Sequence, residues 1–266
     1  MSAKILEAYI DESEIVISGR RSLLYGAAIP GDLETALEGL AQLRAQYGLA
    51  SNLEIKWSSK GGDPVVKAAV KEAAIALVGS LFSCVFVVWA STDKDEAFLQ
   101  MANLLRERAV DCNKSFVHLL HDQGAFRTRS AVLSALSSWA DPACSLLASV
   151  ESSVSPPMQF ADLVTGAFSY LVRAGMGEIS PRSTIFEWRP GHTEDMGLDQ
   201  VFTHLLRRTI PGMMPYMDDF GPSPPEDWMR FLKYCVGKGV VVDSRFSPQE
   251  LEAIRQASTF FTGCMA

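Results

Sequence analysis

The sequence has 266 residues, of which 48% are hydrophobic and 21% are charged, and these proportions are typical of a globular protein. The formal net charge of -7 excludes the strongly basic character of many nucleic-acid-binding proteins, so a nuclease would need metal ions and local basic groups to offset phosphate repulsion. The five cysteines are scattered and form no C-x-x-C pair, which argues against a disulfide framework and a zinc knuckle. We therefore expect a cytoplasmic protein with reduced thiols.

The N-terminal part of the sequence predicts an antiparallel meander followed by helices. The expected strands are residues 4–10, 15–18 and 23–29. A turn around Gly19 would join the last two strands, and a helix is expected over 31–48, where leucines recur at near-helical spacing. Residues 54–57 predict a short extended segment. Asp63 and Pro64 suit the N-cap and first position of a helix that runs to about residue 78.

Residues 73–92 carry no charge over a length that could span a bilayer. Gly79 and Ser80 interrupt this stretch, and the residues that follow are rich in valine and phenylalanine. This pattern predicts the end of a helix and then a buried strand at 81–90, with no membrane span. The N-terminus also lacks the apolar core of a secretory leader.

Strands and helices alternate after residue 81, which predicts parallel pairing within one sheet. The expected strands are 81–90, 115–121 and 144–150, and the expected helices are 93–110, 127–140 and one that starts near residue 156. Combined with the antiparallel opening, this pattern predicts an α/β fold with a mixed sheet flanked by helices.

The character of the chain changes after residue 177, because prolines become frequent between residues 178 and 225. Helices are expected at 196–208, 226–236 and 248–262. We therefore expect one domain over 1–177 and a mostly helical C-terminal extension over 178–266, packed on or beside it.

Asp11 and Glu12 close the first predicted strand. Successive side chains of a strand point to opposite faces, so the two acids cannot both face one ligand without a bend. Asp11 shares its face with Tyr9, and we favour Asp11 as a metal ligand. The alternative is an ordinary solvated strand end.

Glu54 and Lys56 lie two residues apart, so they share a face if this segment is extended. A carboxylate beside an ammonium group suits a site that binds both a metal cation and a phosphate. A surface ion pair with little effect is the ordinary alternative.

Asp122 closes another apolar strand, which also contains His118 and His121. Their spacing would suit a metal on a helix, but it places them on opposite faces of a strand, which argues against a zinc pair. His121 could assist proton transfer, although an ordinary packing role is favoured.

The predicted helix after Ser155 carries the most informative acid. Ser155 suits the N-cap and Pro156 the first helical position. Gln159, Asp162 and Gly166 form a polar or small stripe beside an apolar stripe. This places Asp162 at the border of a buried face, with Gly166 one turn further on, where another element could approach closely.

Three short motifs together resemble domain-of-unknown-function family 3800, which is assigned to the ribonuclease H-like superfamily. The motifs are Tyr9-Ile10-Asp11-Glu12-Ser13, Glu54-Ile55-Lys56 and Gln159-Phe160-Ala161-Asp162-Leu163. The resemblance covers about residues 5–176. The sequence departs from the family at Glu14, where the family usually has glycine, and this affects the local turn more than the acids.

The resemblance implies a ribonuclease H-like fold whose acids bind metal ions. Those roles would fall on Asp11, Glu54, Asp122 and Asp162, with Asp122 matched by position and not by a motif. We assign substrate contacts to Glu12, Lys56 and Gln159. Phosphodiester hydrolysis by two Mg²⁺ or Mn²⁺ ions about 4 Å apart would suit such a set, because hard cations prefer oxygen ligands.

The favoured interpretation is a metal-dependent nuclease that acts on DNA or RNA. A catalytically inactive scaffold that binds a partner is the alternative, and the acidic pI favours it. A serine or cysteine hydrolase ranks third, because the sequence contains no G-x-S-x-G motif. A homo-oligomer is left open. Candidate basic groups for nucleic acid are Arg20, Arg21, Lys56, Lys60, Arg127 and Arg129.

Overall fold

The structure is a computed structural model that describes most of the chain. The described residues are 5–58, 70, 74, 77, 82–140, 142–149, 155–179, 183–189, 192–197, 239–252 and 254. The strands are β1 (Ile5–Ile17), β2 (Arg20–Pro30), β3 (Phe82–Trp89), β4 (Phe116–His121), β5 (Ala143–Ser149), β6 (Ser183–Arg189), β7 (His192–Gly197) and β8 (Val240–Val242). The helices are α1 (Leu33–Gln46), α3 (Lys94–Asp111), α4 (Arg129–Ser137) and α5 (Pro156–Gly175).

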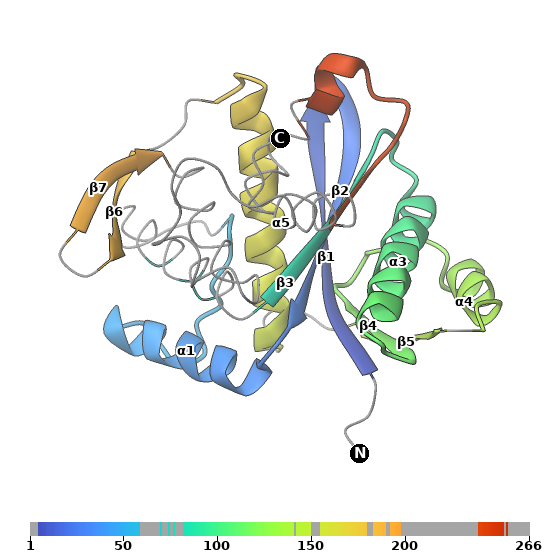
Figure 1. The fold of residues 1–266 in the computed structure, drawn as a ribbon, viewed down its shortest axis with the longest axis horizontal. Helices are drawn as coiled ribbons and strands as arrows, with labels where there is room; N and C mark the ends of the chain where they lie inside the picture. Colours follow the sequence, from blue (N-terminus) through green and yellow to red (C-terminus); the bar gives the residue numbers. More distant parts are fainter. Residues whose placement is uncertain are drawn as a thin grey trace, which may run out of the picture.

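A mixed six-stranded sheet forms the centre of the fold, with strand order β5-β4-β1-β2-β3-β8. Strands β1, β2 and β3 pair antiparallel, β4 and β5 continue parallel to β1, and β8 lies parallel to β3. Helices α1 and α5 lie on one side of the sheet, and α3 and α4 lie on the other (Figure 1). This arrangement confirms the predicted fold class, an antiparallel meander followed by parallel strands between layers of helices.

Strand β1 corrects the predicted meander. Two short strands were expected on either side of residues 11–14, but β1 continues through these residues, because each of them pairs with β2. Asp11 therefore lies in the middle of a strand and not at its end. Its parallel neighbour β4 pairs with β1 only as far as Ile10 and His121. Asp11 thus occupies the position where one of its two neighbouring strands stops.

Alternation along the strands divides the core into two layers. On β1, Tyr9 packs in the cluster that includes α5, whereas Ile10 packs in the cluster that includes α3. Phe86 of β3 stacks on Phe168 of α5 with ring centroids 4.2 Å apart. The alternation predicts that Asp11 faces α5 and that its neighbour Glu12 faces α3.

The described part of the C-terminal extension contains strands that the sequence analysis did not predict. Strands β6 and β7 pair with each other, and β8 joins the edge of the main sheet beside β3. Residues 248–252 and 254 are helical, which agrees with the start of the last predicted helix. The predicted helix at 226–236 lies outside the described residues. The prediction of a helix at 196–208 is wrong at its start, because residues 196 and 197 belong to β7, and the remainder lies outside the described residues. No helix within the described ranges has the length and apolar character needed to cross a membrane.

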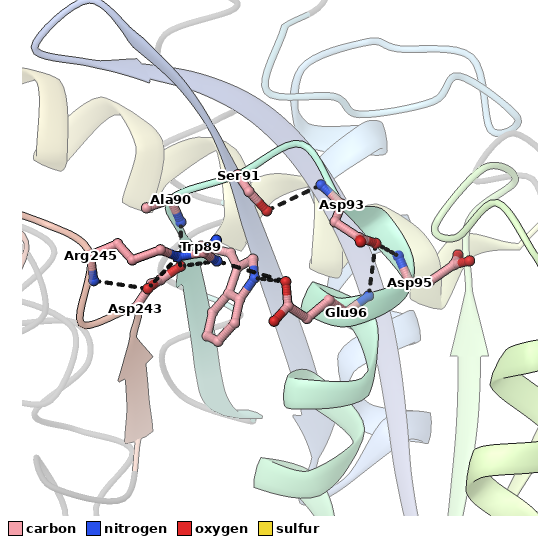
Figure 2. A network of polar contacts seen from close by, with 8 residues as sticks. All are labelled: Trp89, Ala90, Ser91, Asp93, Asp95, Glu96, Asp243 and Arg245. Atoms are coloured by element: carbon pink, nitrogen blue, oxygen red, sulfur yellow. Dashed lines mark hydrogen bonds and ion pairs between the residues drawn. The ribbon is translucent and has the colours of Figure 1, made fainter.

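A polar network holds β8 beside the first turn of α3 (Figure 2). The buried carboxylate of Asp243 accepts hydrogen bonds from Ala90 N at 3.0 Å and from Arg245 Nε at 2.8 Å. The guanidinium of Arg245 lies over the ring of Trp89, and it reaches Glu96 at 3.7 Å. These contacts connect a segment near the C-terminus to the sheet and to α3.

Replacing Arg245 with methionine should lower the free energy of unfolding, because it removes the charged partner of a buried carboxylate. The Arg245 side chain is half exposed, but the Asp243 side chain is only 4% exposed, so loss of Arg245 leaves the charge of Asp243 uncompensated. Urea denaturation of this variant and of the wild-type protein would measure the difference. Unchanged stability would show that the ion pair with Asp243 does not contribute to the fold.

Candidate metal centre

Asp11 and Asp122 lie side by side where β4 ends. The backbone N–H of Asp122 donates to the carbonyl oxygen of Ile10 at 3.1 Å, which continues the parallel pairing of β4 with β1 by one further bond. The negative charge of Asp122 raises the pKa of Asp11. The structure therefore brings these two predicted acids together.

Helix α5 brings Asp162 close to Asp11, because a glycine on β2 allows a close approach. Gly26 pairs with Asp11 across the antiparallel ladder. A Cβ atom at Gly26 would lie 2.3 Å from the hydroxyl oxygen of Thr165, so α5 rests directly on the β2 backbone. Thr165 follows Asp162 by three residues and shares its face of the helix. Among the neighbouring carboxylates, Asp162 raises the pKa of Asp11 most strongly.

The segment around Glu54 is fixed against the first turns of α5. Trp57 N donates to Asp162 Oδ2 at 2.7 Å, and Ile55 N donates to Gln159 Oε1 at 3.1 Å. A Cβ atom at Gly166 would lie only 2.1 Å from Cγ of Trp57, so the indole packs against this glycine. This confirms the predicted close approach at Gly166 and identifies Trp57 as the approaching group.

Gln159 supports this segment from inside the protein. Besides Ile55 N, its Oε1 atom accepts a hydrogen bond at 2.9 Å from the guanidinium of Arg44, which also donates to the carbonyl oxygen of Leu53. Both Gln159 and Arg44 are buried. These contacts give Gln159 a structural role, and its predicted contact with substrate stays a prediction.

Glu54 and Lys56 form an ion pair with 2.9 Å between Oε1 and Nζ. They share a face, as the sequence analysis predicted. The pKa of Lys56 is raised, chiefly by its hydrogen bond to Glu54, and the charges of Asp162 and Asp122 act in the same direction. The ammonium group is therefore a positive charge beside the acids, and it is exposed enough to meet a ligand.

Two of the clustered acids, Asp11 and Asp162, have raised pKa values and so hold their protons unusually tightly. Burial, followed by the charges of Asp162, Glu12 and Asp122, raises the pKa of Asp11 to about 8. Burial is also the main reason why the pKa of Asp162 is raised. A nearby cation would lower both pKa values, because it favours the ionised carboxylates.

The oxygen donors fit Mg²⁺ or Mn²⁺ in chemical type, since these hard cations prefer carboxylate ligands. Among the described residues, however, no group of three or more acidic, histidine or cysteine side chains has the arrangement of a metal-binding cluster. Asp162 Oδ2 accepts from Trp57 N, and Glu54 is paired with Lys56. Binding a metal with all four carboxylates would therefore require side-chain rotation.

Glu12 lies on the other face of the sheet, as the alternation along β1 predicts. Its Oε1 atom accepts a hydrogen bond from Lys94 of α3 at 2.9 Å. His121 is also on the α3 side, where its buried ring packs against Phe98 and Phe126. This supports the expected packing role for His121. The predicted substrate contact of Glu12 would have to be made from this opposite face.

Two groups near the site escaped the sequence analysis. Gly26 could have been noticed, because a glycine within a strand marks a close approach of another element. The role of Lys94 could not be predicted in this way, because nothing in the sequence indicates that a lysine in the first turn of this helix pairs with Glu12. Lys60, a predicted basic group, lies outside the described residues.

Comparisons with known proteins add little to this description. No protein-family model matches the chain, and no curated protein matches it, so the resemblance to domain-of-unknown-function family 3800 stays a prediction. One solved structure, the complex of PCNA and RNase HII from Archaeoglobus fulgidus, contains a similar chain with 13% sequence identity and a TM-score of 0.34. The match covers 84% of this chain and 98% of that chain. This TM-score is too low to support a conclusion about function.

Proposed function

We propose that the protein is a divalent-metal-dependent nuclease that hydrolyses phosphodiester bonds. One observation supports this most directly: Asp11, Asp122 and Asp162 come from two strands and a helix to one place, where their charges raise the pKa of Asp11 to about 8. Such a cluster is costly without a cation, because like charges in a partly buried site destabilise one another. A bound metal ion would offset this cost, because it favours the ionised carboxylates.

The four carboxylates of Asp11, Glu54, Asp122 and Asp162 would hold Mg²⁺ or Mn²⁺. Bound there, the metal would activate a water molecule and stabilise the oxyanion that leaves phosphorus. Lys56 would contact a phosphate oxygen from beside the acids, since its side chain is 39% exposed. The hydrogen bond from Trp57 N to Asp162 Oδ2 would keep the Asp162 side chain oriented.

Exposed basic residues close to Asp122 in the chain would suit a nucleic-acid substrate. Arg127 and Arg129 are exposed and follow Asp122 closely in the chain, at the start of α4. Together with Lys56 they would provide local positive charge in a protein whose net charge is -7. Local cations of this kind are needed to offset the repulsion between phosphates and an acidic protein.

A catalytically inactive scaffold that binds a partner is the second candidate. It is favoured by the absence of a preassembled metal-binding cluster among the described residues. The two candidates differ in their response to metal, because an inactive scaffold need not have a Mn²⁺ site that depends on Asp11.

The test is cleavage of single- and double-stranded DNA and RNA with Mg²⁺, Mn²⁺ or EDTA, combined with calorimetry of Mn²⁺ binding. We expect metal-dependent cleavage by the wild-type protein and none above background by the double variant D11N/D162N. The control variant D32N/E107Q removes the same charge from two exposed acids and should cleave normally. Wild-type protein that cleaves no substrate with any metal, or equal cleavage by D11N/D162N, would refute the proposal.

A further inference from the structure

The residues that follow β4 form a loop whose position determines where Asp122 lies. We call residues 122–128 the β4–α4 loop. Asp122 N is bonded directly to the carbonyl oxygen of Ile10 on β1, and a second link to β1 runs through Lys94, the first residue of α3. Lys94 Nζ donates to the carbonyl oxygen of Gly124 at 2.8 Å and to Glu12 Oε1 at 2.9 Å. One ammonium group therefore connects the residue after Asp11 with the second residue after Asp122.

Two further side chains fix the remainder of the β4–α4 loop. The hydroxyl of Tyr25 donates to the carbonyl oxygen of Ala125 at 2.5 Å. The carboxylate of Asp95 accepts from Arg127 N at 2.6 Å and from Thr128 N at 3.1 Å. All of these anchors lie on the α3 side of the sheet, whereas Asp11 faces α5. The loop is thus fixed by contacts on the face of the sheet opposite to the candidate metal centre.

The ion pair between Glu12 and Lys94 is sheltered from water, with side-chain exposures of 13% and 23%. The Oε2 atom of Glu12 is buried, and no described residue offers it a hydrogen bond. A half-buried carboxylate with a single charged partner depends strongly on that partner, because removal of either group leaves an uncompensated charge. Glu12 therefore fixes the direction of the Lys94 side chain, and Lys94 in turn holds Gly124.

We propose that Lys94, oriented by Glu12, is a positioning residue that sets the separation of the Asp11 and Asp122 carboxylates and thereby the metal affinity of the site. This inference rests on the proposed nuclease function. Neither side chain needs to touch metal or substrate, because both act through the backbone of the β4–α4 loop. Residues that orient metal ligands from outside typically change metal affinity or activity by roughly 10- to 100-fold.

The variant Lys94→Met tests this role. It keeps the aliphatic stem and removes the ammonium group that reaches Gly124. We expect the Kd for Mn²⁺ to rise by roughly 10- to 100-fold, and kcat to fall while KM for the nucleic acid stays nearly constant. Raised Mn²⁺ concentrations should restore much of the activity. Amide hydrogen exchange in residues 122–128 should also become faster, and this measurement does not depend on metal.

The variant Glu12→Gln and the control Arg245→Met make the test specific. The amide oxygen of the introduced glutamine can still accept from Lys94, so the effect of Glu12→Gln on Mn²⁺ affinity should be smaller than that of Lys94→Met. Arg245→Met removes an ion pair with Glu96, also in the first turn of α3, together with the ion pair to Asp243 (Figure 2). It should leave Mn²⁺ affinity unchanged.

Three results would overturn the positioning role while leaving the nuclease proposal intact. In the first, wild-type protein cleaves and Lys94→Met binds Mn²⁺ equally well. In the second, hydrogen exchange of the β4–α4 loop is unchanged in Lys94→Met. In the third, Glu12→Gln abolishes Mn²⁺ binding that Lys94→Met retains, which would make Glu12 itself a ligand. Wild-type protein that neither binds Mn²⁺ nor cleaves would instead overturn the proposed function and, with it, the role of Lys94 in metal affinity.

Discussion

Asparagine in place of Asp11 should make the metal-free protein more stable at neutral pH and, at the same time, abolish metal-dependent cleavage. The two effects have one cause. The folded protein raises the pKa of Asp11 from 3.8 to about 8, chiefly through burial and then through the charges of Asp162, Glu12 and Asp122. Ionising this carboxyl group therefore costs free energy in the folded state unless a cation is bound.

The direction of the pH dependence follows from proton binding. Between pH 3.8 and about 8 the folded protein retains a proton on Asp11 that the unfolded chain has released. The free energy of unfolding must then fall as pH rises through this interval. The asparagine side chain in the D11N variant cannot ionise, so the variant lacks this contribution. Near pH 8 its metal-free form should be more stable than the wild-type protein by an amount on the order of a few kcal/mol.

Urea denaturation between pH 5 and 8.5, with EDTA or with Mn²⁺, would measure both effects. Mn²⁺ should stabilise the wild-type protein near neutral pH, because it binds the folded state, and it should not stabilise D11N. The control D32N replaces an exposed acid at the N-cap of α1, where asparagine also caps well. If the free energy of unfolding had the same pH dependence in D11N and in the wild-type protein, the pKa of Asp11 would not be raised in the folded state.

Alanine in place of Gly26 should destabilise the fold and weaken the metal site. The added Cβ would lie 2.3 Å from the Thr165 hydroxyl oxygen and 3.2 Å from Thr165 Cα. The first contact involves a side chain, but the second involves the helix backbone, so α5 itself must shift. Overpacking of this kind typically costs about 1–3 kcal/mol. A shift of α5 would also move Asp162 away from Asp11, so we expect weaker Mn²⁺ binding.

The matched variant Thr165→Ala removes a buried hydroxyl that has no hydrogen-bond partner among the described residues, so it should be nearly neutral alone. In the double variant G26A/T165A, part of the lost stability and Mn²⁺ affinity should return, because the shorter of the two contacts is gone. Urea denaturation and calorimetry of all four proteins give the coupling free energy. If G26A were as stable as the wild-type protein, the inference that α5 packs directly on the β2 backbone at Gly26 would be wrong.

Local patterns in the sequence were sufficient for the fold class and for several features of the site. Alternation of strands and helices predicted the mixed sheet. The two-residue period of a strand assigned Asp11 and Glu12 to opposite faces, and in the structure Glu12 pairs with Lys94 of α3. The helical stripe that predicted a close approach at Gly166 was also right. Periodicity succeeds here because it depends only on neighbouring residues.

Local patterns failed where pairing decides the conformation. Residues 11–14 are polar and were interpreted as the end of a strand, but their backbone groups pair with β2 and the strand continues. Strand β8 was missed because three valines become a strand only beside β3. A short segment has no strong preference of its own, so its partner determines its structure.

The sequence by itself determined which residues could be metal ligands and which face of its element each one occupies. The tertiary structure decided which of them meet. Asp11 and Asp162 come together because Gly26 and Thr165, far apart in the chain, lie in contact. Asp122 lies beside Asp11 because its backbone N–H bonds to Ile10 on β1, and Lys94 is bonded to Gly124 in the same loop; no spacing rule connects these residues. Such contacts depend on how whole elements pack, and packing is a property of the folded chain that no local pattern contains.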